Sequence, residues 1–359
     1  MRKVIRTSRK LPLRSISLML LLAGTLNVAP RAEADEASEA LKQFQQPLDE
    51  AIDRGLKFLS ENQKEDGLFP GQYGNTTAVA ALTGMAYLSK GYTPGRGPYG
   101  EHINRCVDLV LKSEQQKDGK PSGYFVRTGE GKMYAHCIST LFLSEVCGMI
   151  DEERQNKIDD ALPRALSLIL EAQNVEKDEN NRGGWRYEPQ SRDSDLSLTG
   201  WAVMALRSAR LNGAQVPQEN IERAVEYILR CQPKDASGEK GFSYQARQGG
   251  KPAMTGVAIL CLSLTGQSGN EMVTRAGDWI LSQNAHKQWG GSHFYYQNYY
   301  CTQAMFQLGG TYWDTWATEL YQNAFKRQNE NGSWGSPYDT AMTVLALTVS
   351  YRQLPVYQR

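Results

Sequence analysis

The sequence lacks three features that would assign a function at once. Lysine and arginine total 40 and aspartate and glutamate total 39, so a net charge of +1 offers no basic excess for nucleic acid. No Cys-x-x-C pair occurs, which leaves a zinc-ribbon site without support. After residue 34 no apolar run reaches the roughly 20 residues of a membrane span. We therefore expect no nucleic-acid partner, no membrane span and no metal.

The six cysteines lie in apolar or amphipathic stretches, not in a spacing typical of a disulfide framework. A buried cysteine behaves as a small apolar residue, and a chain of this length does not depend on cross-links to form a core. The sequence predicts mostly free, buried thiols.

The first 34 residues have the pattern of a secretory signal peptide. A basic start precedes an apolar run over residues 16–29, and Ala32-Glu33-Ala34 is typical of a cleavage site. We expect residues 35–359 to form the mature protein, exported to the periplasm or secreted.

Paired helices repeat along the mature chain. In each pair an amphipathic helix, such as residues 48–62, is followed by a helix that is apolar nearly all round. The apolar helices are expected at residues 77–88, 134–146, 196–206, 253–264, 299–308 and 339–349. Buried helices behind amphipathic ones, six times over, predict an all-α fold: one closed α/α toroid over residues 35–359, with six helical hairpins in two rings. An open solenoid is the alternative, but it needs atypical capping repeats at its ends.

Residues 54–69 (RGLKFLSENQKEDGLF) carry the fullest copy of the repeat, and its glutamine recurs at intervals of roughly 50 residues. This pattern resembles the QW motif of the terpenoid cyclase and protein prenyltransferase superfamily, over about residues 47 to 355. The tail (YYCTQAM, then YRQLP) is similar to exported squalene-cyclase-like proteins of planctomycete type, with prenyltransferase and squalene oxidase repeats. The resemblance implies a toroid with a central cavity, in which the repeated Gln and Trp residues join hairpins and are not catalytic.

Squalene–hopene-type cyclases of this superfamily protonate an alkene with the middle acid of an Asp-x-Asp-Asp-Thr-Ala motif. The nearest stretch here holds Asp193 and Asp195, and in the register of the following helix Ser197 takes the place of the acid. Asp193 and Asp195 are the catalytic candidates that the resemblance implies. The alternative interpretation, which we weigh more heavily, is that they cap a helix and complement its dipole.

The zinc ligands of the prenyltransferases are incomplete, because no Asp-x-Cys pair occurs. The interpretation we favour places His286 and His293 in a surface loop and His136 in the core. No cofactor is expected, and the sequence leaves open whether the chain is an enzyme.

Aromatic and acidic residues gather where the apolar helices begin, and we expect them to line a central cavity for an apolar, terpenoid-like ligand. An equal alternative is that the rings simply fill the barrel. The expected lining residues are Trp185, Tyr187, Trp201, Tyr244, Tyr296, Tyr299, Tyr300, Tyr338 and Asp339.

Three functions remain open at this point. The first is a squalene-cyclase-like toroid that binds, and in the stronger form cyclises, an apolar ligand. The second is a non-catalytic exported scaffold for a protein or glycan. The third is a polysaccharide lyase, in which Arg192, His293 and Tyr295 would neutralise and deprotonate a uronic acid. This third function depends on analogy of fold alone.

Overall fold

The structure, a computed structural model, describes residues 39–71, 73–127, 132–233 and 241–357. The predicted signal peptide lies outside the described residues. Residues 38–359 form one compact unit. No helix among the described residues combines the length and the apolar character that crossing a membrane requires.

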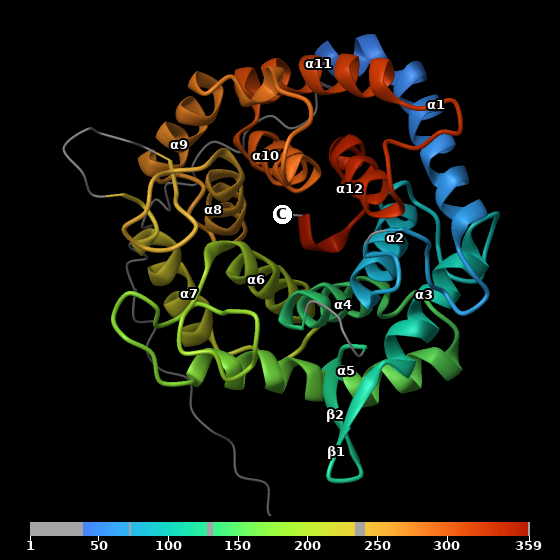
Figure 1. Ribbon diagram of the computed structural model, residues 1–359, viewed down its shortest axis with the longest axis vertical. Coiled ribbons are helices and arrows are strands. Elements are labelled where there is room, and N and C mark those ends of the chain that lie inside the picture. Colours follow the sequence, from blue (N-terminus) through green and yellow to red (C-terminus); the bar gives the residue numbers. More distant parts are fainter. Residues whose placement is uncertain (1–38, 72, 128–131, 234–240, 358–359) are drawn as a thin grey trace, which may run out of the picture. The chain divides into compact units, whose positions relative to one another are not determined.

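The described residues form two concentric rings of helices (Figure 1). The inner ring consists of α2 (Thr77–Ser89), α4 (Met133–Val146), α6 (Leu196–Leu211), α8 (Pro252–Leu264), α10 (Phe294–Leu308) and α12 (Pro337–Leu347). The outer ring consists of α1 (Glu39–Asn62), α3 (Gly100–Lys112), α5 (Glu152–Asn174), α7 (Gln218–Arg230), α9 (Glu271–Ser282) and α11 (Gly310–Arg327). Each inner helix contacts the next, and α12 contacts α2. This closure confirms the predicted α/α toroid and is incompatible with an open solenoid.

Short elements complete the unit. Strands β1 (Glu114–Lys117) and β2 (Lys120–Phe125) pair as an antiparallel hairpin. The 3-10 turns are η1 (Ala285–Lys287), η2 (Val349–Tyr351) and η3 (Pro355–Tyr357). The turn η3 follows the last inner helix and lies inside the inner ring (Figure 1).

Hydrophobic patterning explains the two rings. On α1 the apolar positions Leu48, Ile52, Leu56 and Leu59 are all 0% exposed, while the charged residues Glu50, Asp53, Arg54 and Lys57 between them are exposed to water. In contrast, every residue of α4 except Tyr134 is buried. A helix with one apolar stripe stays outside, and a helix that is apolar all round must be covered by others. All six cysteines are free thiols, and five of them are buried.

The repeated glutamines join neighbouring hairpins. At the end of α5 the Gln173 amide donates to the Asn220 carbonyl in the first turn of α7, at 2.9 Å. At the end of α11 the Gln328 amide donates in the same way to the Ala51 carbonyl of α1, at 2.8 Å. This second bond connects the last repeat to the first, so it contributes to closing the outer ring.

Two repeat glycines lie in the left-handed region and touch the neighbouring hairpin. Gly183 has φ +89°, and a Cβ there would lie 2.2 Å from the Arg223 carbonyl oxygen. Gly332 has φ +87°, and its Cβ would lie 2.4 Å from the Arg54 carbonyl oxygen. Any side chain at either place would push the loop off the next outer helix.

Hydrogen bonds between equivalent ends show that the inner helices run parallel. Tyr134 and Ser197 bond through their hydroxyls at the starts of α4 and α6. Thr348 and Ser89, which end α12 and α2, bond at 2.8 Å. The Tyr296 hydroxyl, in the first turn of α10, also donates to the Ser197 carbonyl in the first turn of α6. The N-termini of α4, α6 and α10, with the positive ends of their helix dipoles, therefore face one end of the toroid.

Candidate functional site

Asp195 caps the N-terminus of α6. Its Oδ1 accepts hydrogen bonds from the Leu198 N–H at 2.9 Å and from the Ser197 hydroxyl at 2.7 Å. The side chain is fully buried, and burial raises the pKa of its carboxyl, although these two hydrogen bonds and the charge of Arg186 oppose the shift. The geometry accounts for Asp195 as a helix cap, and the raised pKa is also what a proton donor needs.

Arg186 brings the two candidate aspartates together. Its guanidinium lies 3.4 Å from the Asp195 carboxylate and 3.3 Å from the exposed Asp193 carboxylate. The same guanidinium lies over the rings of Tyr187 and Tyr244, at 4.4 and 5.4 Å from their centroids. This guanidinium charge opposes, but does not cancel, the raising of the Asp195 pKa by burial.

A tyrosine lies in the first turn of three inner helices and in the loop before each of the other three, and we call this set the tyrosine rim. The Tyr187 and Tyr244 hydroxyls are hydrogen-bonded, and the Tyr134 ring lies 5.8 Å from that of Tyr187. On the opposite side Tyr73 and Tyr338 meet edge to face at 5.8 Å. The members of the rim are Tyr73, Tyr134, Tyr187, Tyr244, Tyr296 and Tyr338.

A column of aromatic rings leads from the rim to the centre of the toroid. The Tyr296 hydroxyl points to the Ser197 carbonyl at 3.4 Å, and its ring lies 4.8 Å from Tyr300. Tyr300 contacts Trp201 edge to face at 5.4 Å, and Trp201 stacks on Tyr299 at 5.8 Å. Four expected lining residues, Tyr296, Tyr300, Trp201 and Tyr299, therefore lie in one continuous aromatic path.

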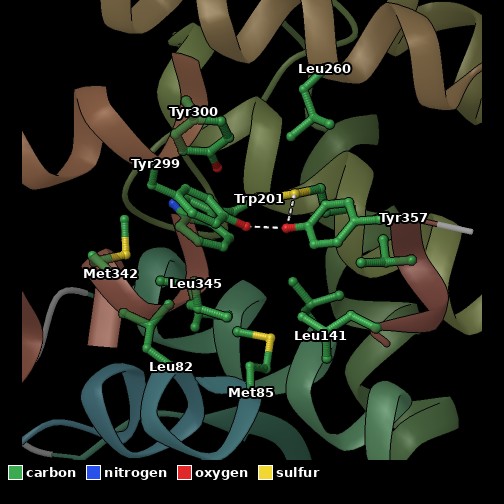
Figure 2. Packing of buried hydrophobic residues seen from close by; sticks show 14 of the residues in the cluster. Leu82, Met85, Leu141, Trp201, Leu260, Tyr299, Tyr300, Met342, Leu345 and Tyr357 are labelled. Atoms are coloured by element: carbon green, nitrogen blue, oxygen red, sulfur yellow. Dashed lines mark hydrogen bonds between the residues drawn. The ribbon is translucent and has the colours of Figure 1, made fainter. Parts of the chain in front are cut away.

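Side chains fill the centre where this path ends. The Tyr299 hydroxyl bonds to that of Tyr357, which also approaches the Met204 sulfur at 3.9 Å (Figure 2). Trp201, Tyr299 and Tyr300 are at most 2% exposed. In the described residues, the space expected to be an open cavity thus holds the chain's own side chains.

Two small hollows lie beside the C-terminal segment. Their volumes are about 10 and 70 Å³, and Leu354 lines both of them. Pockets for drug-sized ligands measure roughly 300–1,000 Å³. Neither hollow would accept an isoprenoid unless part of the chain moved.

Two expected lining residues have other partners. Trp185 donates its indole N–H to the Ile169 carbonyl of α5 at 2.7 Å, so it packs between the rings and not into the centre. Asp339 forms a capping box with Ser336 at the start of α12. Both placements are structural, so the expectation that Trp185 and Asp339 line the centre is corrected: one indole bonds an outer helix and one carboxylate caps a helix start.

The histidines offer no site in the described residues. His136 is buried, its Nε2 lies 3.2 Å from the Ala165 carbonyl, and burial lowers its pKa to about 3. It is the hydrogen-bonded core residue that the sequence indicated. No group of three or more His, Cys, Asp or Glu among the described residues is placed to hold a metal ion.

Two residues around the C-terminal segment were not predicted from the sequence. Glu145 on α4 is 1% exposed and accepts from the Val356 N–H, and Arg207 on α6 donates to the Val356 carbonyl at 3.1 Å. Burial raises the pKa of Glu145 to about 7. The sequence did contain a sign of these two residues, because each is a charged residue in or directly after an apolar run. Charged residues are seldom buried without a partner, so a buried partner could have been expected for each.

No protein-family model matches the sequence, and no curated protein matches it. Among solved structures, type II terpene cyclase MstE from Scytonema, in its apo form, gives a TM-score of 0.57 at 15% identity and covers 86% of this chain and 98% of that chain. The same cyclase as a variant with its product merosterolic acid A gives 0.56 at 16% identity, covering 88% and 99%. This chain has the terpene cyclase fold.

The likeness extends beyond cyclases. A glycosidase variant gives a TM-score of 0.51 at 12% identity, covering 86% of this chain and 98% of that chain. At such identities the terpene cyclase fold is what the comparisons establish. Any chemistry of this chain depends on its own site residues, which are the tyrosine rim, the aromatic column and Asp195.

Proposed function

We propose that this chain is an exported terpenoid-cyclase-like protein that binds an isoprenoid along the aromatic column and protonates it from the Asp195 carboxyl. The observation that carries the proposal is a fully buried carboxyl with a raised pKa at the rim end of that column. Burial favours the neutral, proton-bearing form of a carboxyl. MstE, with the same fold, is a type II terpene cyclase that has been seen with geranylgeranyl dihydroxybenzoate.

Ser197 connects the acid to the column. It occupies the place of the acid in the family motif, and here its hydroxyl bonds both Asp195 and Tyr134. In the proposed step the Ser197 hydroxyl turns away from Oδ1, its oxygen accepts the carboxyl proton, and its own proton passes to the alkene, whose π electrons form the new C–H bond. The resulting cation would lie beside aromatic faces, which attract positive charge. Ring closure and loss of a proton then restore the acid.

Asp195→Asn tests the proposal, with Asp193→Asn as the matched control because that carboxylate pairs with the same arginine from the surface. Purified protein would be incubated with squalene and with geranylgeranyl-bearing arenes, and products identified by mass spectrometry. We expect cyclised product from wild type and from the control, and at least a 100-fold loss with Asp195→Asn. Equal turnover by Asp195→Asn would exclude Asp195 as the acid.

The filled centre favours a second candidate, a non-catalytic scaffold for a protein or glycan. In that case neither conversion nor isoprenoid binding would occur. Export is tested separately: the N-terminal residue of protein recovered from the exported fraction should be Asp35. Recovery of an uncleaved chain from the cytosol would contradict this part of the proposal.

A further inference from the structure

The last residues of the described chain turn inward instead of ending on the surface. We call Leu354–Tyr357 the C-terminal plug. Leu354, Val356 and Tyr357 are 3%, 0% and 6% exposed. The buried cluster that contains Tyr357 includes at least one side chain from every inner helix: Leu82, Leu141, Trp201, Leu260, Tyr299 and Leu345 (Figure 2). The plug therefore fills the space that the toroid encloses.

A few polar contacts hold the plug. The Val356 N–H donates to both carboxylate oxygens of Glu145, at 3.2 and 3.3 Å. Arg207 donates from Nε to the Val356 carbonyl at 3.1 Å, and also to the Leu264 carbonyl of α8 at 2.6 Å. Both charged groups act on one residue of the plug and belong to helices that would remain if it left. The plug is thus a terminal segment that binds to the ring, and the ring helices do not depend on it for their own connections.

The plug occupies a space suited to an apolar chain with one hydroxyl group. If it withdrew, the apolar side chains of six helices would line the space it leaves. Two hydroxyls would also face it: Tyr299, which would lose its bond to Tyr357, and Tyr300, whose buried hydroxyl has no hydrogen-bond partner among the described residues. A buried hydroxyl without a partner is costly, and a ligand oxygen would satisfy it.

We infer that the C-terminal plug is an autoinhibitory occupant of the isoprenoid site, and that an isoprenoid alcohol displaces it by placing its hydroxyl at Tyr299 and Tyr300. This inference rests on the proposed function, because it assumes that the centre is where ligand binds. A tethered segment competes at a high effective concentration. The apparent affinity for ligand is reduced by the fraction of molecules in which the plug is withdrawn.

The test compares a chain that ends at Gln353 with one that ends at Tyr357. Binding of geranylgeraniol would be measured by quenching of tryptophan fluorescence, alongside a hydrocarbon of the same carbon number. We expect the shorter chain to bind the alcohol at least 10-fold more tightly than the longer one, and to bind it more tightly than the hydrocarbon. Equal affinity of the two chains would overturn the inference, and equal affinity for alcohol and hydrocarbon would overturn the role of the hydroxyls.

Two further measurements keep this outcome clear. If the shorter chain does not fold, Tyr357→Ala replaces it, because this variant keeps both contacts to Val356. If Tyr357→Ala also fails to fold, the plug is part of the structural core and the inference is overturned. A hydrophobic dye separates this inference from the proposed function. If the shorter chain takes up dye but does not bind the isoprenoid, the plug does occupy a binding space, and the proposed isoprenoid ligand is wrong. If the shorter chain takes up no more dye than the longer one, the inference about the plug is wrong.

Discussion

The hydroxyls of Tyr299 and Tyr357 hydrogen-bond to each other at the centre of the inner ring, connecting α10 to the last described turn of the chain. Both side chains are buried among apolar residues. Inside such a core a hydroxyl that loses its partner is not compensated by water.

Tyr299→Phe should therefore lower the free energy of unfolding by about 1 kcal/mol, measured by urea denaturation. The control is Tyr312→Phe, which removes a hydroxyl that donates to Asp278 at 2.7 Å on the surface. That change should stay within about 0.5 kcal/mol. Equal effects of the two substitutions would show that the central bond adds nothing to stability.

Glu145 should make stability depend on pH. Burial raises its pKa from 4.5 to about 7, so the folded state holds this proton more tightly than the unfolded state. Its contribution is greatest below pH 4.5 and is lost as pH rises through about 7. The full loss is on the order of 3 kcal/mol.

Glu145→Gln should remove that dependence, because glutamine still offers the Val356 N–H an oxygen but does not titrate. Urea denaturation at several pH values between 5 and 8 would show a flatter profile than wild type. Glu153→Gln, an exposed carboxylate paired with Lys157, serves as the control. A wild-type slope in Glu145→Gln would contradict the assignment.

Apolar runs predicted the inner helices well because burial on all sides leaves a local signal. The expected 134–146 and 253–264 each begin one residue late, and α6 begins at Leu196 as predicted. The expected start of α10 at residue 299 was wrong by five residues, because Phe294 and the two tyrosines after it form the first turn of this helix.

The content of the centre was harder to predict, for a physical reason. A terminal segment as short as Leu354–Tyr357 has no periodicity, and its position depends on contacts with residues far away in the sequence, such as Glu145 and Arg207. Asp195 was placed correctly as a helix cap because capping is local. The hydrogen bond between the Tyr187 and Tyr244 hydroxyls could not be predicted from the sequence, because it forms only where two separate loops meet.

Asp195 has two roles that different substitutions should separate. Asp195→Ala removes the cap of α6 and should lower the free energy of unfolding by about 0.5–2 kcal/mol. Asp195→Asn keeps an oxygen for the Leu198 N–H, so its stability should lie close to that of wild type while the acid is lost. Thermal and urea denaturation would measure both variants. If Asp195→Ala and Asp195→Asn destabilise the protein equally, α6 is stabilised by the negative charge of Asp195 and not by its capping hydrogen bond.

Gln328 should matter more to the toroid than its equivalent Gln283. The Gln328 amide donates to the carbonyls of Ala51 and Gly332, both at 2.8 Å, and so holds the last hairpin to the first. The Gln283 amide only approaches the neighbouring Ser282 hydroxyl at 3.4 Å, on the surface. Gln328→Ala leaves two carbonyls without their donor, and a typical hydrogen bond contributes about 0.5–1.5 kcal/mol.

We therefore expect Gln328→Ala to lower the free energy of unfolding by about 1–3 kcal/mol. Gln283→Ala should change it by less than about 0.5 kcal/mol. Hydrogen exchange would add a positional readout: in Gln328→Ala, loss of protection should be greatest in α1 and α11, the two helices that the bond connects. Loss spread evenly over all outer helices would argue that the ring does not depend on this closure.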